Sequence, residues 1–130
     1  MKRITLILIG LSFVLFQYSF SQTVESKAKT IQIAFNNRDA DVLTWYFCDR
    51  VELILPDADN TCPKEQAKAV MADFFAKKQP KNFEIIHQGS RENVSFITGK
   101  MDGVDGVSYR VNILFKKDGN DLLIYQLRIE

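Results

Sequence analysis

The sequence predicts an α+β domain in which helices pack on one face of a curved antiparallel sheet. Apolar residues recur at helical spacing in the first half of the chain, and four strand-type segments with short turns follow from residue 83 onward. Helices and strands that are segregated along the chain in this way are typical of α+β domains. A sheet curved around the longest helix would make a cone-shaped fold with a pocket between its two layers.

The first 21 residues have the three parts of a secretory signal peptide. The head is basic (Lys2 and Arg3), residues 4–16 form an uncharged apolar run, and Ser19 and Ser21 supply small residues at the −3 and −1 positions of a cleavage site. A membrane anchor is the alternative, but the apolar run is shorter than the roughly 20 residues that span a bilayer. We therefore expect export to the periplasm or secretion, with no stable membrane insertion after cleavage.

Cleavage would leave residues 22–130 as a single domain of nearly neutral charge. Loss of Lys2 and Arg3 would reduce the 17 basic residues to 15, against 16 acidic residues. This balance argues against a nucleic-acid partner, which normally requires a basic surface. The sequence also has no glycine-rich phosphate loop and no serine-nucleophile elbow, so it indicates no cofactor.

Two helices are expected before residue 48. The stretch TVESKAKTIQIAFNN carries Val24, Ala28, Ile31 and Phe35 on one apolar stripe. A shorter helix is expected through ADVLTWYF, with Asp39 or Asp41 as its cap. The aromatic residues 45–47 at its end are interpreted as part of the core.

The longest helix is expected in CPKEQAKAVMADFFAKKQP. Pro63 suits the start of a helix, Lys77 and Lys78 suit the negative end of its dipole, and Pro80 follows it. One continuous apolar face is formed by Ala67, Val70, Met71, Phe74 and Phe75.

Five strands are expected around these helices. RVELIL precedes the long helix, and FEIIHQG, NVSFITGKM, VSYRVNILFKK and DLLIYQLRIE form an antiparallel meander after it. The stretch DADN, residues 57–60, resembles the start of a calcium loop, but Cys62 and Lys68 occupy the positions that need a glycine and a bidentate acid. We interpret it as a solvated turn and expect no metal site, since one histidine and two cysteines do not make a zinc cluster.

The order of these elements, together with QAKAVMADFF, NFEIIHQGS, FITG and the terminal IYQLRIE, resembles domain-of-unknown-function family 4783. That family consists of small secreted bacterial proteins with a nuclear-transport-factor-2-like, or cystatin-like, fold. The resemblance extends over roughly residues 23–130 and is strongest from Gln66 to Gly89. It implies the cone-shaped fold, and it implies no functional residues, because the shared patterns are core residues and turns.

His87, the only histidine, decides between a catalytic and a non-catalytic interpretation. Strand alternation places it on one face with Phe83 and Ile85, where an imidazole could act as a general base. A base needs an orienting partner, and Asp49 is close only if its strand neighbours that of His87. We therefore favour a structural or binding role. The residues expected to line the pocket and bind a ligand are Trp45, Tyr46, Asp49, Phe74, His87 and Tyr109.

Cys48 and Cys62 leave two alternatives open. A disulfide suits an oxidising compartment, but the strand between them carries the chain about 20 Å away before the loop that leads to Cys62. A bond would need that loop to fold back, so that the Cα atoms approach within about 7 Å. Two buried free thiols are the other alternative.

Three functions are compatible with these features. The first is a non-catalytic exported domain that binds a small apolar or peptide ligand in the cone pocket. The second is an interaction module or homodimer that uses the sheet face, since apolar residues lie on both faces of the last strand. The third, which we rank last, is an enzyme that uses His87 with Asp49 or with one of the tyrosines Tyr46, Tyr109 and Tyr125.

Overall fold

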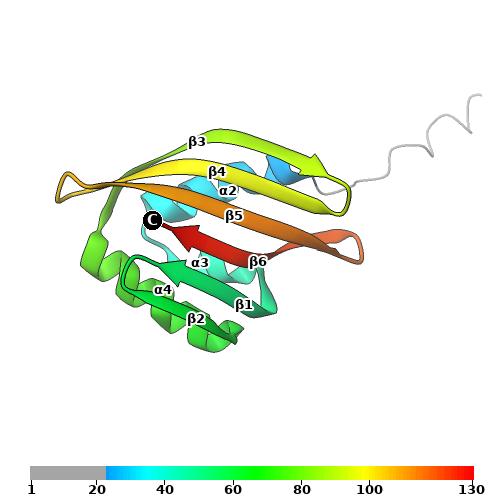
Figure 1. Ribbon diagram of the computed structural model, residues 1–130, viewed down its shortest axis with the longest axis horizontal. Helices are drawn as coiled ribbons and strands as arrows, with labels where there is room; N and C mark the ends of the chain where they lie inside the picture. Colours follow the sequence, from blue (N-terminus) through cyan, green and yellow to red (C-terminus); the bar gives the residue numbers. More distant parts are fainter. Residues whose placement is uncertain (1–22) are drawn as a thin grey trace, which may run out of the picture.

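The computed structural model describes residues 23–130, which form three helices on one side of a six-stranded sheet (Figure 1). The predicted signal peptide, residues 1–21, lies outside the described residues. The elements in chain order are α2 (Val24–Asn36), α3 (Ala40–Trp45), β1 (Phe47–Leu55), β2 (Ala58–Pro63), α4 (Lys64–Lys78), β3 (Pro80–Arg91), β4 (Val94–Gly103), β5 (Ser108–Asp118) and β6 (Asp121–Ile129). Helices on one face of a mainly antiparallel sheet confirm the α+β fold.

The strands follow the order β2-β1-β6-β5-β4-β3, so β3 and β2 are the two edges. The four strands from β3 to β6 form the expected antiparallel meander. The sheet is nevertheless mixed, because β1 pairs with β6 in parallel. Strand β2, helix α4 and strands β3 to β5 lie between β1 and β6 in the sequence and make the long connection that a parallel pair requires.

The helices begin and end close to where their patterns predict. Thr23 caps α2, where its side chain accepts a hydrogen bond from the Ser26 N–H, and Asp39 caps α3 through the Val42 N–H. In α4 the predicted apolar face is buried, apart from the partly exposed Val70. Its last turn ends at Gln79, which has a left-handed conformation with φ of 45°.

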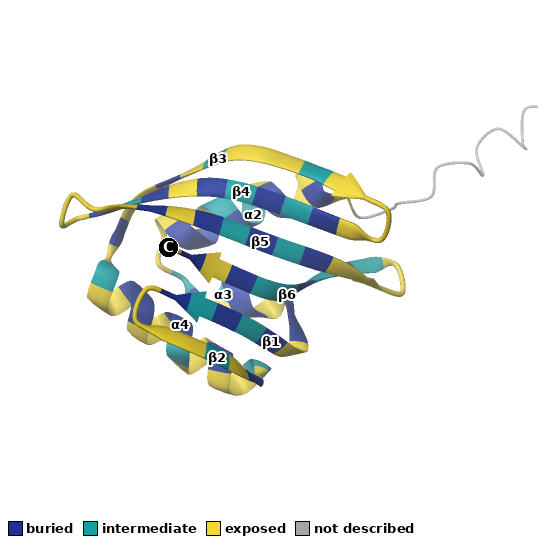
Figure 2. Ribbon diagram, viewed as in Figure 1, coloured by how far each residue is buried: buried dark blue, intermediate teal, exposed yellow. Residues whose placement is uncertain are grey.

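Buried residues, dark blue in Figure 2, occur on the sheet and on the helices and form one hydrophobic core between them. Phe35, Phe47, Phe83 and Phe115 are at most 1% exposed. Phe35 stacks on Phe83 with ring centres 4.5 Å apart and meets Phe75 edge to face at 5.4 Å. The helices and the meander are therefore joined by one aromatic core in the part of the cone where a pocket was expected.

Two local predictions were wrong. Residues 58–63 are strand β2, which pairs with β1 after a short turn, whereas we interpreted 57–60 as a solvated turn. The segment has few β-branched residues, and its pairing with β1 determines the conformation. Trp45 was expected in the core, but it is 69% exposed at the end of α3, and only Phe47 of the aromatic triplet is fully buried.

Candidate functional site

The most exposed part of the sheet is the second half of β3, which contains His87. Between Ile85 and His87 the pairing with β4 shifts by one residue, so that Ile86 is an extra residue in a β-bulge. The bulge reverses the alternation after Ile85. We expected His87 on the same face as Phe83, and this was wrong, because the bulge places it on the other face. It pairs with Thr98 and lies on the outer face, away from the helices.

His87 and Phe96 line one wall of an outer hollow of about 700 Å³. The two ring centres lie 5.5 Å apart, and the ring of Phe96 covers Gly89 so closely that a Cβ atom there would come within 3.1 Å of it. Val94 and Leu114 add apolar surface, and the β3–β4 turn adds Arg91 and Glu92. Its volume is within the range of small-ligand pockets, and its lining combines apolar side chains with polar and charged ones.

A second hollow, of about 490 Å³, lies on the other side of the same stretch of β3, against α2. It is lined by Glu25, Ala28, Lys29 and Gln32 of α2 and by residues 85–88 of β3. Ile86, 64% exposed, lies in this hollow. His87 and Gln88 line both hollows, so the two meet across the edge of the sheet.

The first half of β3 has a different edge. There the Phe83 N–H donates to Asn36 Oδ1 at 2.8 Å, and Arg38 Nε donates to the Pro80 carbonyl at 3.0 Å. The end of α2 and the loop after it thereby hold the edge of β3 at Pro80 and Phe83, before the bulge. Beyond the bulge, no side chain of residues 23–130 hydrogen-bonds to the backbone of Gln88 or Ser90.

The six predicted pocket residues do not converge. Trp45 and Asp49 are exposed and Tyr46 is partly buried, whereas Phe74 and Tyr109 are buried in the core. Of the six, only His87 lines either of the hollows beside β3. A contact between any of them and a ligand stays a prediction.

The structure brings neither Asp49 nor Tyr109 to His87. Strands β1 and β3 are separated by β6, β5 and β4, so Asp49 and His87 are about 19 Å apart across the sheet. Tyr109 lies on the opposite face of the sheet from His87, beside Lys78, whose Nζ is 6.0 Å from its ring centre. Among residues 23–130, no group of three or more His, Cys, Asp or Glu side chains could hold a metal ion.

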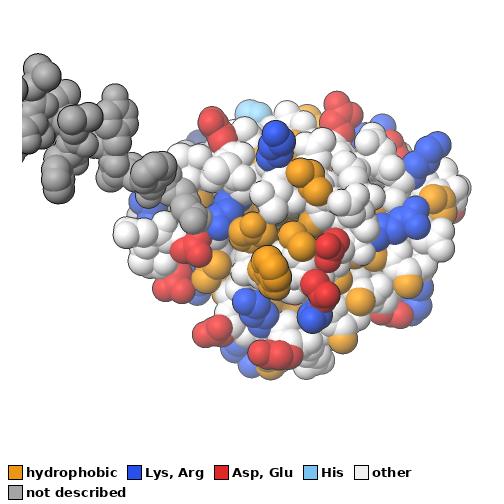
Figure 3. Space-filling model, turned by 180° about the vertical axis from the view of Figure 1, so that it is seen from behind, with side chains coloured by type: hydrophobic (Ala, Val, Ile, Leu, Met, Phe, Trp, Pro, Cys, Tyr) orange, Lys and Arg blue, Asp and Glu red, His pale blue; other side chains and the backbone are white. Residues whose placement is uncertain are grey.

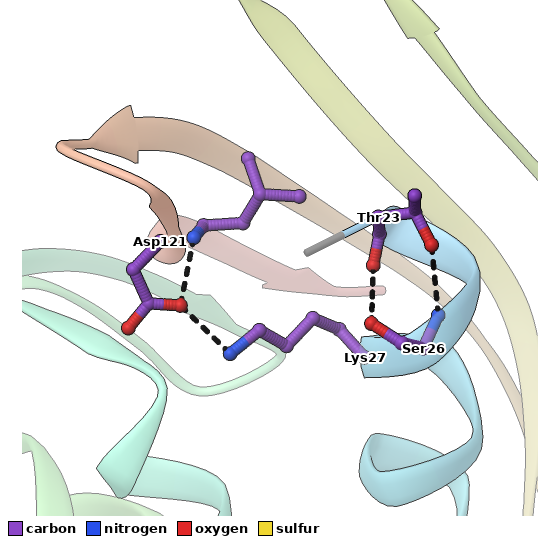
Figure 4. Close-up of polar contacts among 5 residues, drawn as sticks. Thr23, Ser26, Lys27 and Asp121 are labelled. Carbon is purple, nitrogen blue, oxygen red and sulfur yellow. Dashed lines mark hydrogen bonds and ion pairs between the residues drawn. The ribbon is translucent and has the colours of Figure 1, made fainter. Parts of the chain in front are cut away.

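A partly buried ion pair fixes the other end of α2 (Figure 4). Lys27 is 7% exposed; its Nζ donates to Asp121 Oδ1 at 2.9 Å and lies 4.4 Å from the ring centre of Tyr46. The hydrogen bond from Lys27 holds the pKa of the Asp121 carboxyl below its ordinary value, although burial acts in the opposite direction. The pair thus fastens α2 to the start of β6.

Cys48 and Cys62 are both buried free thiols, which is the second of the two alternatives. Cys62 pairs with Val51, three residues along β1 from Cys48. Burial raises the pKa of both thiols, so neither has the features of a reactive cysteine.

The helical face also carries apolar surface. Hydrophobic side chains gather near its centre, between acidic and basic ones (Figure 3), and Trp45 and Ile33 are the large exposed hydrophobic residues of the helices. None of the helices within residues 23–130 is long and apolar enough to cross a membrane.

Known proteins share both the sequence pattern and this architecture. The model of domain of unknown function DUF4783 matches residues 28–130. A DUF4783 family protein from Bacteroides ovatus is 31% identical, with a TM-score of 0.73 over 85% of this chain and 96% of that one. One from Bacteroides uniformis is 30% identical, with a TM-score of 0.73 over 78% of this chain and 94% of that one.

A more distant match shows the fold alone. An NTF2-like protein of unknown function from Cytophaga hutchinsonii is 11% identical, with a TM-score of 0.59 over 86% of this chain and 93% of that one. No curated protein matches the chain. The resemblance noted in the sequence is confirmed: the chain belongs to the DUF4783 family and has an NTF2-like fold.

Proposed function

We propose that this protein is an exported, non-catalytic binding domain for a small apolar or peptide ligand, and that it binds at the second half of β3. One observation carries the proposal: the two hollows meet at His87 and Gln88, whereas the interior of the cone is filled by aromatic side chains. Binding at this edge needs no catalytic partner for His87. The proposed site therefore lies at the surface, whereas we expected the ligand in the interior of the cone.

Native mass spectrometry of the protein purified from its exported compartment tests the proposal. We expect a co-purifying mass that disappears on denaturation, and loss of that mass in Phe96→Ser, which removes the apolar wall of the outer hollow. Val107→Ser is the matched control, because Val107 is also a partly exposed apolar residue but lies by the β4–β5 turn. A mass that Phe96→Ser retains would place the ligand elsewhere and contradict the proposal.

Export has its own test. The basic head, apolar run and small residues before Gln22 support cleavage after Ser21. N-terminal sequencing of the exported protein should begin at Gln22. An intact Met1 in the purified protein would contradict this part of the proposal.

A homodimer is the second candidate, and the outer face of the sheet favours it. Five large side chains there are neither buried nor fully exposed: Ile54, Phe96, Leu114, Leu123 and Tyr125. Four strands of nine to eleven residues make a face of about 30 by 19 Å, or roughly 600 Å² per copy. Two copies would together bury roughly 1,200 Å², more than the total of about 1,000 Å² that a specific interface needs. Light scattering should then give twice the monomer mass, and Leu123→Lys should restore the monomer without loss of the ligand mass.

A further inference from the structure

We infer that the second half of β3 binds an extended peptide as an additional strand, and that α2 selects a basic residue followed two positions later by an acidic one. The inference rests on the proposed function and specifies its ligand. It follows from the hydrogen-bonding pattern of β3, from the groove beside it and from the order of charges on α2.

The backbone of β3 offers a template for a strand. The β3–β4 turn has two residues, so its closing pair, Arg91 and Val94, is hydrogen-bonded, and alternate residues back to His87 direct their N–H and C=O groups to β4. Gln88 and Ser90 consequently direct theirs away from the sheet. A peptide backbone is the partner that matches a row of such groups at strand spacing.

The bulge limits where a peptide can bind. Before the bulge the end of α2 and the following loop occupy the edge at Pro80 and Phe83, through the bonds of Arg38 and Asn36. Ile86 then interrupts the ladder, as bulges at sheet edges commonly do. The free edge therefore extends from Ile86 to Arg91, enough for a segment of about six residues.

The groove gives such a peptide a second wall. Glu25, Ala28, Lys29 and Gln32 occupy one face of α2 and line the hollow against β3. A strand added to β3 would turn alternate side chains towards this face, with Ala28 and Ile85 as apolar floor. Binding between an edge strand and a helix explains why the hollow lies there and not in the interior of the cone.

The charges of Glu25 and Lys29 on α2 determine the order of two charged residues in the peptide. Glu25 and Lys29 are four residues apart, about 6 Å along the helix, which is close to the roughly 6.8 Å between side chains i and i+2 of a strand. α2 runs antiparallel to β3, because its last residue, Asn36, meets Phe83 while Glu25 lies with Gln88. A peptide antiparallel to β3 therefore passes Glu25 first and Lys29 second, which calls for a basic and then an acidic residue.

Two synthetic peptides test the inference: Ac-TVKVEVT-NH2 and its charge-reversed counterpart Ac-TVEVKVT-NH2. Titration of the isotope-labelled protein by NMR should move the amide signals of Gln88 and Ser90 and slow their hydrogen exchange. Two exposed ion pairs should favour the first peptide by about three- to tenfold. In the double variant Glu25→Lys with Lys29→Glu, the preference should reverse.

A proline substitution isolates the backbone contribution. Gln88→Pro removes an N–H group that points away from β4 and so leaves the β3–β4 ladder intact. We expect it to weaken binding of the first peptide by about tenfold relative to Gln88→Ala, which loses the same side chain and keeps the N–H group, so that the difference reports one lost hydrogen bond. If Gln88→Pro does not fold, the peptide preference of the double variant Glu25→Lys with Lys29→Glu tests the inference without it.

Three results would overturn the inference. One is equal binding of both peptides, and another is a set of shifted amides remote from residues 86–91. The third is protection of Gln88 and Ser90 that rises with protein concentration without peptide, which would identify a second copy as the occupant. The dye 1-anilinonaphthalene-8-sulfonate, an anion with a large apolar ring system, separates failure of the peptide inference from failure of the proposed function. Dye that binds in a Phe96-dependent way without any peptide binding would leave the proposed function intact and refute the peptide.

Discussion

The two halves of β3 belong to one strand and have opposite surroundings. Before the bulge, Phe83 is fully buried under α2, and its N–H is bonded to Asn36. After the bulge, most residues of β3 are exposed and yellow in Figure 2. No α2 side chain hydrogen-bonds to the backbone of Gln88 or Ser90 there. One extra residue, Ile86, therefore divides a buried segment that α2 holds from an exposed segment with a free edge.

The largest expected difference between the halves is in how much the free energy of unfolding falls when a side chain is truncated. Phe83→Ala removes a 0% exposed ring that stacks on Phe35, and we expect it to lower the free energy of unfolding by about 3–5 kcal/mol. Ile86→Ala, on the same strand but 64% exposed, should change it by less than about 0.5 kcal/mol. Urea denaturation measures both. Similar costs at the two positions would refute the division of β3.

Alanine substitution of a glycine beside each half of β3 should give a smaller difference in stability. A Cβ atom on Gly99 would lie 2.7 Å from the Phe83 ring and 2.9 Å from the Glu84 carbonyl oxygen, so Gly99→Ala should cost about 1–3 kcal/mol. In Gly89→Ala the nearest atoms, at 3.1 Å, belong to the partly exposed ring of Phe96, which has room to move. We expect the smaller loss of thermal stability there, together with a changed outer hollow. A greater loss in Gly89→Ala would show that the outer hollow is rigid.

The ion pair of Lys27 with Asp121 tests how firmly α2 holds the groove. Asp121→Asn leaves a nearly buried ammonium without its carboxylate. We expect a cost of about 1–2 kcal/mol, below that of a fully buried pair because the Asp121 side chain is 47% exposed.

The stability difference between wild type and Asp121→Asn should depend on pH. The folded state lowers the pKa of Asp121, so its contribution is complete above the unfolded pKa, near 3.9, and is lost as the pH falls through the lower folded value. Unfolding measured between pH 7 and pH 2 checks this. A difference that stays constant across that range would show that the charge of Asp121 contributes nothing.

The smallest effect concerns the covered edge itself. Asn36→Ala leaves the Phe83 N–H without its acceptor and should cost about 1 kcal/mol, with faster hydrogen exchange at Phe83. Gln32→Ala, one helical turn earlier on α2 and beside the open half, is the matched control and should leave that exchange rate unchanged. Equal exchange rates at Phe83 in both variants would mean that the edge is covered without this bond.

Most of the fold could be predicted from the sequence, because the helical stripes and the turns are local patterns. Val24, Ala28, Ile31 and Phe35 all lie in the core, as their spacing predicts. Strand β2 could not be recognised, since its conformation depends on pairing with β1. The parallel pairing of β1 with β6 is likewise a long-range contact with no local signature.

The candidate site was harder to predict than the fold. Simple alternation from Phe83 places His87 inside, and only the pairing with β4 reveals the extra residue that moves it outside. Trp45 was expected in the core because it belongs to an aromatic cluster, but it lies exposed at the end of α3. The pair Ile85-Ile86 was the one available signal, because two adjacent isoleucines cannot both face the core of a regular strand.

The central position of β6 has a consequence for the order of folding. This strand joins β1 to β5, yet it consists of the last residues of the chain, Asp121–Ile129. Until these residues have been synthesised, the β1–β2 hairpin and the β3–β5 meander have no strand between them. The sheet therefore remains in two separate parts until β6 has been added.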